Sequence, residues 1–185
     1  MKKSFLGAVA VTLALVASMF TFIPAAAAEP VCTINVAESN TTVQGTNLGD
    51  VICITGDNNI VNALGGDDTV VDDGTDNTIN LGEGFDTYDG TGGDGSTVDG
   101  GSGDDNLTGT PGPDEFMGGE GNDFLVGGAA NDTLNGGLGA DQLSGDAGDD
   151  NISGDAGDDS ADGGDGADLI NGGVGDDSLV GGASN

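Results

Sequence analysis

The feature that most constrains this chain is a nine-residue repeat that runs without interruption over residues 100–180. Each copy has small residues at positions 1 and 4, an aspartate at position 6 and an apolar residue at position 8. The position-6 column consists of Asp105, Asp114, Asp123, Asp132, Asp141, Asp150, Asp159, Asp168 and Asp177. The position-8 column consists of Leu107, Phe116, Leu125, Leu134, Leu143, Ile152, Ala161, Ile170 and Leu179. A short fixed period of this kind predicts a solenoid, in which each repeat stacks on its neighbours.

The apolar column continues toward the N-terminus, although the glycines at positions 1 and 4 are mostly lost there. It contains Ile34, Val43, Ile52, Val61, Val70, Ile79 and Tyr88, and one extra residue near Gly90 then shifts the frame to Val98. Position 6 reads Thr41, Asp50, Asn59, Asp68, Asn77, Asp86 and Ser96 over the same stretch. Terminal repeats of a solenoid are usually atypical because they cap it. We therefore expect a cap at residues 29–62, degenerate repeats at 63–99 and the regular array at 100–185; the alternative for 29–62 is a separate small domain.

The charge of the chain is almost entirely of one sign. Asp and Glu number 33, Lys and Arg only 2, and there is no His, which gives a formal net charge of −31. Self-repulsion of this size, with few bulky apolar residues, predicts disorder unless cations bind. The composition argues against binding to nucleic acid or anionic membranes, because phosphate recognition needs Lys or Arg. An acidic halophile-like surface would scatter its carboxylates, whereas here they recur every ninth residue.

Residues 1–28 are typical of a secretory signal peptide. Lys2 and Lys3 provide the positive start, residues 5–23 the apolar run, Pro24 a break, and residues 26–28 an A-x-A cleavage site. An uncleaved membrane anchor is the alternative, since the apolar run could just span a bilayer. Cleavage fits the small-residue end better, so we expect a secreted, extracellular protein without membrane contact after cleavage.

The two cysteines, Cys32 and Cys53, would then meet an oxidising environment. In a secreted chain such a pair predicts a disulfide, with two buried thiols as the alternative. A zinc site is not expected, because the chain has two Cys, no His and no C-x-x-C.

Within one repeat, the glycines permit the positive φ and tight curvature of a turn over positions 1–6. Such a turn directs backbone carbonyl oxygens inward, and position 6 adds a carboxylate. An all-oxygen site selects a hard cation, and Ca²⁺ fits best because it accepts six to eight oxygens in flexible geometry. Positions 7–9 are long enough only for a short strand, with the position-8 side chain in the core.

One turn and one strand reverse the chain, so two repeats make a coil of 18 residues. The aspartates then alternate between two edges of the solenoid. One edge holds Asp105, Asp123, Asp141, Asp159 and Asp177; the other holds Asp114, Asp132, Asp150 and Asp168. One cation between each stacked pair of turns gives about seven Ca²⁺ in the regular array. Metal binding and folding are then expected to be one event.

The array resembles the hemolysin-type (RTX) calcium-binding repeat, closely over residues 100–180, recognisably over 81–89 (LGEGFDTYD) and weakly over 63–71. The resemblance implies a right-handed parallel β-roll, with calcium between successive turns held by loop carbonyls and by the position-6 aspartates, Asp86 included. Departures from the pattern are Thr110, Ala130, Asp146, Asp155 and Ala161. Many family members are toxins or proteases, but no catalytic domain accompanies the repeats here, so those activities are not carried over.

Catalysis is not expected, because the chain after removal of residues 1–28 has none of the His, Lys and Arg that nucleophile–base pairs and oxyanion sites use. Glu115 and Glu120 lie in neighbouring repeats but are most simply solvated loop positions. Two functions remain: a secreted calcium-binding roll that serves as scaffold or ion buffer, or a calcium-stiffened cell-surface adhesion or matrix component. A cluster of Phe116, Met117, Phe124 and Val126 is either a sticky patch or local core packing. The sequence does not identify a protein or polysaccharide partner.

Overall fold

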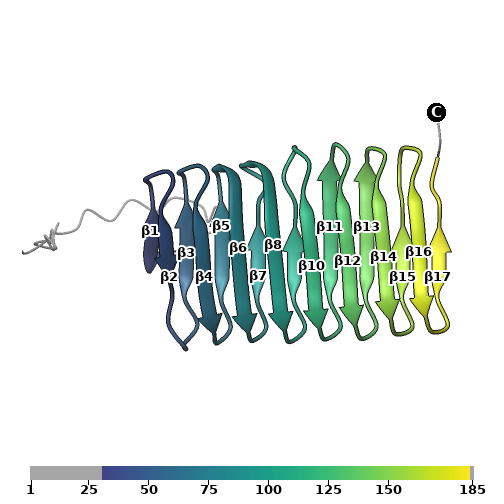
Figure 1. Ribbon diagram of the computed structural model, residues 1–185, viewed down its shortest axis with the longest axis horizontal. Coiled ribbons are helices and arrows are strands. Elements are labelled where there is room, and N and C mark those ends of the chain that lie inside the picture. The colour runs from purple at the N-terminus through teal and green to yellow at the C-terminus, as the bar shows by residue number, and fades with distance from the viewer. Residues whose placement is uncertain (1–30, 184–185) are drawn as a thin grey trace, which may run out of the picture.

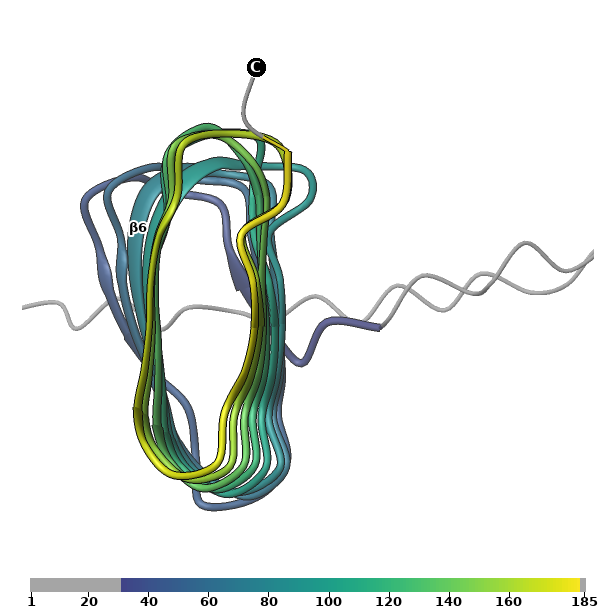
Figure 2. The same ribbon diagram turned by 90° about the vertical axis from the view of Figure 1, so that its right-hand side faces the viewer.

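The computed structural model describes residues 31–183, so the expected signal peptide at 1–28 lies outside the described residues. The described chain winds into a flattened tube, with its strands in two parallel sheets (Figures 1 and 2). Successive strands alternate between the sheets, so that one coil contains two strands and two turns. Residues 31–183 contain no helix, and thus none that is long and apolar enough to span a membrane. The predicted all-β solenoid is confirmed.

The odd-numbered strands form one sheet, called here the first sheet, and the even-numbered strands form the second sheet. The first sheet consists, in spatial order, of β1 (Ile34–Val36), β3 (Val51–Ile54), β5 (Thr69–Asp72), β7 (Thr87–Asp89), β9 (Asn106–Thr108), β11 (Phe124–Ala129), β13 (Gln142–Ala147), β15 (Ser160–Asp162) and β17 (Ser178–Val180). The second sheet consists of β2 (Thr42–Gln44), β4 (Ile60–Gly65), β6 (Thr75–Glu83), β8 (Asp94–Ser102), β10 (Glu115–Glu120), β12 (Thr133–Leu138), β14 (Asn151–Ala156) and β16 (Leu169–Val174).

The strand register confirms the predicted periodicity, including its irregularity. Ile52 pairs with Val70, and Leu125 with Leu143, each at a spacing of one 18-residue coil. Tyr88, however, pairs with Leu107, one residue further along, which is the extra residue expected near Gly90. The N-terminal strands β1 to β4 belong to the same two sheets, so the winding begins before the glycine-rich repeats do.

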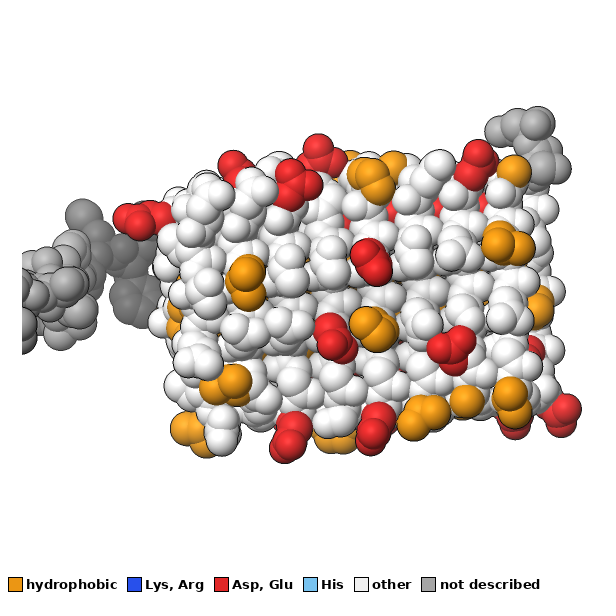
Figure 3. Space-filling view, viewed as in Figure 1, with side chains coloured by type: hydrophobic (Ala, Val, Ile, Leu, Met, Phe, Trp, Pro, Cys, Tyr) orange, Lys and Arg blue, Asp and Glu red, His pale blue; other side chains and the backbone are white. Residues whose placement is uncertain are grey.

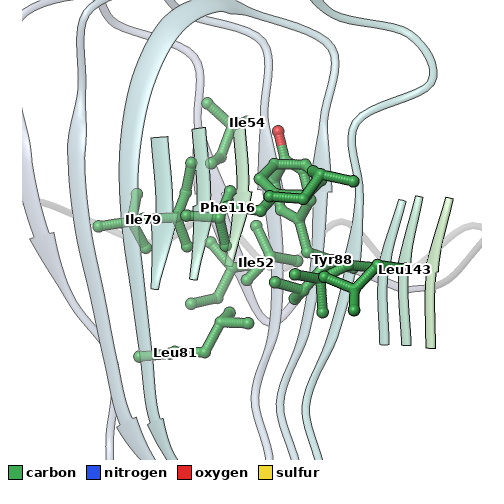
Figure 4. Packing of buried hydrophobic residues seen from close by; sticks show 14 of the residues in the cluster. Ile52, Ile54, Ile79, Leu81, Tyr88, Phe116 and Leu143 are labelled. Carbon is green, nitrogen blue, oxygen red and sulfur yellow. The ribbon is translucent and has the colours of Figure 1, made fainter. Parts of the chain in front are cut away.

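The position-8 side chains of both sheets point into the tube and form its core, except Leu179 in the last coil, which is exposed (Figure 4). The aromatic rings of Tyr88 and Phe116 meet there edge to face, with ring centroids 5.7 Å apart. The N-terminal coils bury a second apolar column at position 1, where the regular array has glycine: Val36, Ile54, Ala63 and Leu81. The core is therefore fuller in the N-terminal coils than in the regular array.

The structure contains a disulfide between Cys32 and Cys53, which joins the segment before β1 to strand β3. It does not bring Phe116, Met117, Phe124 and Val126 together as one surface. Phe116 is buried, Met117 faces outward from β10 in the second sheet, and the other two belong to β11 in the first sheet. The four residues are thus divided between the core and two opposite faces.

Candidate metal centre

The turns between strands form the two long edges of the tube. Turns that lead into the first sheet make up what we call the first edge, and turns that lead into the second sheet make up the second edge. The first edge holds Asp86, Asp105, Asp123, Asp141, Asp159 and Asp177, and the second edge holds Asp114, Asp132, Asp150 and Asp168. All ten predicted ligands thus lie on the edges to which the 18-residue coil assigns them.

The backbone of each regular turn depends on residues in the left-handed region. Gly101 and Gly103, at positions 2 and 4, have φ of 101° and 126°, which side chains with a Cβ rarely adopt. Three departures from glycine keep the same conformation at some cost: Ala130 (φ 75°), Asp146 (φ 66°) and Asp155 (φ 69°). Thr110 does not take a positive φ, so its turn has a different backbone.

Position 1 of each regular repeat must be glycine for a second reason. A Cβ built on Gly100 would lie 2.5 Å from Asp105 Oδ2 and 2.5 Å from the carbonyl oxygen of Gly118 in the next coil. The same pair of oxygens, one carboxylate and one carbonyl, faces Gly118, Gly145 and Gly154. The missing side chain therefore leaves a cradle into which oxygen atoms of two stacked turns converge.

One oxygen of each position-6 carboxylate is fixed by the preceding coil. The N–H of Asp105 donates to Asp123 Oδ1 at 2.8 Å, and the N–H of Asp123 donates to Asp141 Oδ1 at 2.8 Å. The second edge follows the same rule, as in the bond of 2.8 Å from the Asp132 N–H to Asp150 Oδ1. These hydrogen bonds hold the carboxylates in a stack at the strand spacing of about 4.8 Å.

The other oxygen of most of these carboxylates is buried and has no hydrogen-bond partner. The set comprises Oδ2 of Asp68, Asp86, Asp105, Asp123, Asp132, Asp141, Asp150, Asp159 and Asp168. The residues that the structure describes include no Lys, Arg or His that could neutralise them. A buried unsatisfied polar group costs about 1–3 kcal/mol, and a charged one more. A repeated cost of this kind, always at the same atom, indicates a site for a cation.

The pKa values follow from this burial. Burial raises the pKa of Asp105 to about 7, the hydrogen bond from the Asp86 N–H opposes the rise, and nearby carboxylates add to it. The same causes raise the pKa of Asp132 to about 7 and that of Asp123 to about 6. Because each shift reflects a carboxylate without a counter-charge, a divalent cation at these oxygens would lower the pKa again.

The donor set consists of oxygen atoms only, which suits Ca²⁺. Among residues 31–183, no three Asp, Glu, His or Cys side chains gather closely enough to hold a metal by themselves. A site would combine stacked aspartates with backbone carbonyls such as that of Gly118. The residues present therefore fit Ca²⁺, because each cradle brings a carboxylate oxygen and a backbone carbonyl oxygen together.

Sequence reasoning missed one residue of this type, Asp68. It is buried, its Oδ1 accepts the N–H of Asp50 at 2.7 Å, and its Oδ2 has no partner. Burial raises its pKa to about 6. The position-6 register already includes Asp68, but its turn has Ala63 and Leu64 where the regular repeat has glycines at positions 1 and 2.

Comparison with known families supports this assignment. A model of the RTX calcium-binding nonapeptide repeat, in four copies, matches six overlapping segments that together span residues 54–185. The segments are residues 54–88, 88–125, 99–134, 108–143, 126–161 and 153–185. A search of curated proteins found no match to the chain. The matched span includes every aspartate whose Oδ2 lacks a partner.

Proposed function

Since the chain belongs to the family of RTX calcium-binding nonapeptide repeat proteins, we propose that it is a secreted protein whose array folds as several Ca²⁺ bind between stacked turns. Its role is that of a calcium-dependent scaffold or ion buffer, without catalysis. The proposal includes a division into a signal peptide (1–28), an N-terminal cap (29–62), degenerate repeats (63–99) and the calcium-binding array (100–185).

The observation that carries the proposal is the row of unpartnered Oδ2 atoms along both edges. Each is buried, each belongs to a carboxylate, and no cationic side chain lies among residues 31–183. At neutral pH the array is therefore unfavourable unless positive charge enters from solution. Folding of the array is therefore coupled to metal binding.

The ligands would be the position-6 aspartates of the two edges together with the turn carbonyls. Bound Ca²⁺ would supply the positive charge that stacked carboxylates lack. One ion between each stacked pair of regular turns gives about seven sites, and extracellular calcium modules typically bind with Kd of about 10⁻⁴ to 10⁻³ M.

A calcium titration followed by far-ultraviolet circular dichroism tests the proposal, with Mg²⁺ as the control. We expect a β-sheet spectrum to develop with Ca²⁺ and not with Mg²⁺ at the same concentration, because Mg²⁺ requires a rigid octahedron and retains its waters. A full β-sheet spectrum that persists in EGTA would contradict calcium-coupled folding and remove the basis for these ligands.

The alternative role, a calcium-stiffened adhesion or matrix component, would need a specialised exposed face. On the face shown in Figure 3, acidic and hydrophobic side chains are scattered singly among polar ones. No observation favours this role over the first one.

A further inference from the structure

The second edge changes its chemistry along the roll. In the same register as Asp114, Asp132, Asp150 and Asp168, the N-terminal coils carry Thr41, Asn59, Asn77 and Ser96. The ladder of hydrogen bonds continues through the two asparagines, with the Thr41 N–H on Asn59 Oδ1 (2.9 Å) and the Asn59 N–H on Asn77 Oδ1 (2.8 Å). The two neutral amides therefore accept the same bond as the aspartates without bringing their charge.

At position 6, Asn77 has a neutral amide where a regular turn has an aspartate that would bind a cation. Its Nδ2 donates to the carbonyl oxygen of Gly56 in the preceding coil at 3.1 Å and to Asp72 Oδ1 at 2.8 Å. An amide has the shape of a carboxylate, but its NH₂ carries the positive partial charge that a turn carbonyl would otherwise receive from a metal. This turn is closed by the chain itself.

Asp72, at position 1 of the same turn, accepts further hydrogen bonds that hold the turn together. The fully buried carboxylate accepts the Gly74 N–H (2.9 Å) on Oδ1, and the hydroxyls of Ser96 (3.2 Å) and Tyr88 (3.3 Å) on Oδ2. With Asn77, four groups donate to its two oxygens, so it is not among the carboxylates with an unpartnered oxygen.

In two other turns, a threonine at position 2 donates hydrogen bonds to the position-6 aspartate. The N–H and hydroxyl of Thr110 both donate to Asp114 Oδ2, at 2.7 Å and 3.0 Å. Thr46 makes the same two contacts with Asp50 Oδ2, at 2.7 Å and 3.0 Å. Both turns have the pattern G-T-x-x-x-D, and in both the oxygen that is unpartnered elsewhere is satisfied. Asp114 thus differs from Asp132, although both occupy position 6.

We infer that the coils of residues 32–98 are a part of the roll that folds without calcium, and that the need for calcium begins in the regular array, at Asp105 on the first edge and beyond the Thr110–Asp114 turn on the second edge. In these coils, hydrogen bonds within the chain satisfy the Asp72 carboxylate and the Asn77 amide of the second edge, and the second apolar column at position 1 enlarges the core. Among the buried side-chain atoms of these coils, Oδ2 of Asp68 and of Asp86 on the first edge and Nδ2 of Asn59 on the second edge have no hydrogen-bond partner. The inference rests on the proposed function, because it divides the roll by calcium requirement.

Hydrogen–deuterium exchange with mass spectrometry, on the protein in Ca²⁺ and in EGTA, tests this division. In EGTA we expect peptides from residues 42–98 to exchange at least about 100-fold more slowly than an unstructured chain, and peptides from 124–180 to lose protection. Loss of protection throughout would overturn the inference and leave the proposed function intact. Protection retained throughout would overturn the proposed function and the inference with it.

The substitution Asn77→Asp removes the NH₂ donor at nearly constant shape. We expect protection of residues 42–98 in EGTA to fall at least about tenfold, and Ca²⁺ to restore it. Asn47→Asp is the matched control, because Asn47 is exposed in a first-edge turn and the change adds the same charge. Equal effects of the two substitutions would show that charge alone matters and would overturn the inference.

Thr110→Val provides a second variant if Asn77→Asp does not fold. The Thr110 hydroxyl oxygen accepts the N–H groups of Gly95 (2.8 Å) and Gly112 (3.0 Å), which lose their partner in the valine variant. We expect these two amides to exchange at least about tenfold faster in EGTA than in the wild type. Unchanged exchange would refute the threonine closure and, with it, the boundary at this turn.

Discussion

At position 6 of a regular repeat, the two carboxylate oxygens of one aspartate have different surroundings. In Asp123, Oδ1 accepts the N–H of Asp105, while Oδ2 lies buried against Gly118 without a hydrogen-bond partner. An asparagine at this position could still accept the backbone N–H on its Oδ1. It would lack the negative charge that binds a cation. The structural and the metal-binding contributions of the same residue can therefore be separated by experiment.

Asp141→Asn tests this separation in the middle of the first edge. We expect the midpoint of the calcium titration to rise roughly tenfold or more, since the loss of a charge-assisted contact costs about 1.5–3 kcal/mol. Asp158→Asn removes the same charge from an exposed position-5 side chain one coil further along, and we expect less than a twofold change. Circular dichroism during the titration provides the measurement. Equal shifts in both variants would contradict a specific role for position 6.

Gly118→Ala tests the cradle itself. The new Cβ would meet Asp123 Oδ2 and lie 2.6 Å from the Gly136 carbonyl oxygen, so either the ion site or the strand spacing must distort. Overpacking of this kind costs about 1–3 kcal/mol, which we expect as a loss of unfolding free energy in saturating Ca²⁺. In Gly181→Ala, a Cβ has nothing within 4 Å, and we expect no loss. Urea unfolding measures the free energy of unfolding of both variants. An unchanged value for the Gly118 variant would contradict the proposed oxygen cradle at position 1.

At the scale of strands and turns, the edges act as rows of coupled acids. Burial raises the pKa of Asp105 and Asp132 to about 7 and that of Asp123 to about 6, from an ordinary value of 3.8. The folded chain therefore binds more protons than the unfolded chain between about pH 4 and pH 7. Without calcium, the contribution of these protonated aspartates to the free energy of unfolding is fully present below about pH 4. It is lost as the pH rises through their pKa values in the folded chain.

We therefore expect acid to replace calcium in part. In EGTA, the β-sheet signal in circular dichroism should increase as pH falls from 7.5 to about 5, because protonation removes the repulsion within each row. Calcium affinity should weaken over the same range, since the ion competes with protons for Oδ2. A calcium-free chain that loses β-sheet on acidification would contradict this assignment of the raised pKa values.

The register of these elements could be predicted from sequence, whereas the partners of each aspartate could not. The apolar column placed Ile79, Tyr88 and the extra residue near Gly90 correctly, because period and burial are properties of the chain alone. Whether Oδ2 is free depends on contacts within the folded turn and between coils. Asp68 and Asp114 show this: the first keeps a free oxygen despite its degenerate turn, and the second loses it to Thr110.

At the scale of the whole molecule, negative charge is spread along a long, narrow body. Residues 31–183 contain no basic side chain, and acidic groups lie along both edges and on the outer face shown in Figure 3. Removal of Ca²⁺ should therefore expand the molecule and not merely loosen single turns. The expansion should come from the regular array, where the core is thinner.

Small-angle X-ray scattering measures this expansion directly. We expect the radius of gyration to rise by roughly a third or more in EGTA, and to return to its original value with Ca²⁺ but not with an equal concentration of Mg²⁺. A matched NaCl series separates general screening from specific binding, because screening acts on all exposed charges alike. Recovery in NaCl alone would attribute compaction to ionic strength and not to bound calcium.

The bonds from each position-6 N–H to the carboxylate of the following coil all point the same way along the roll. The N–H of Asp105 donates to Asp123 in the next coil, and the N–H of Asp123 donates to Asp141 in the coil after that. The position-6 N–H of a finished coil thus stays unpaired until the next coil brings its carboxylate acceptor. Growth of the roll consequently has a polarity, which coincides with the order in which a ribosome releases the chain: each arriving segment finds a binding partner already in place.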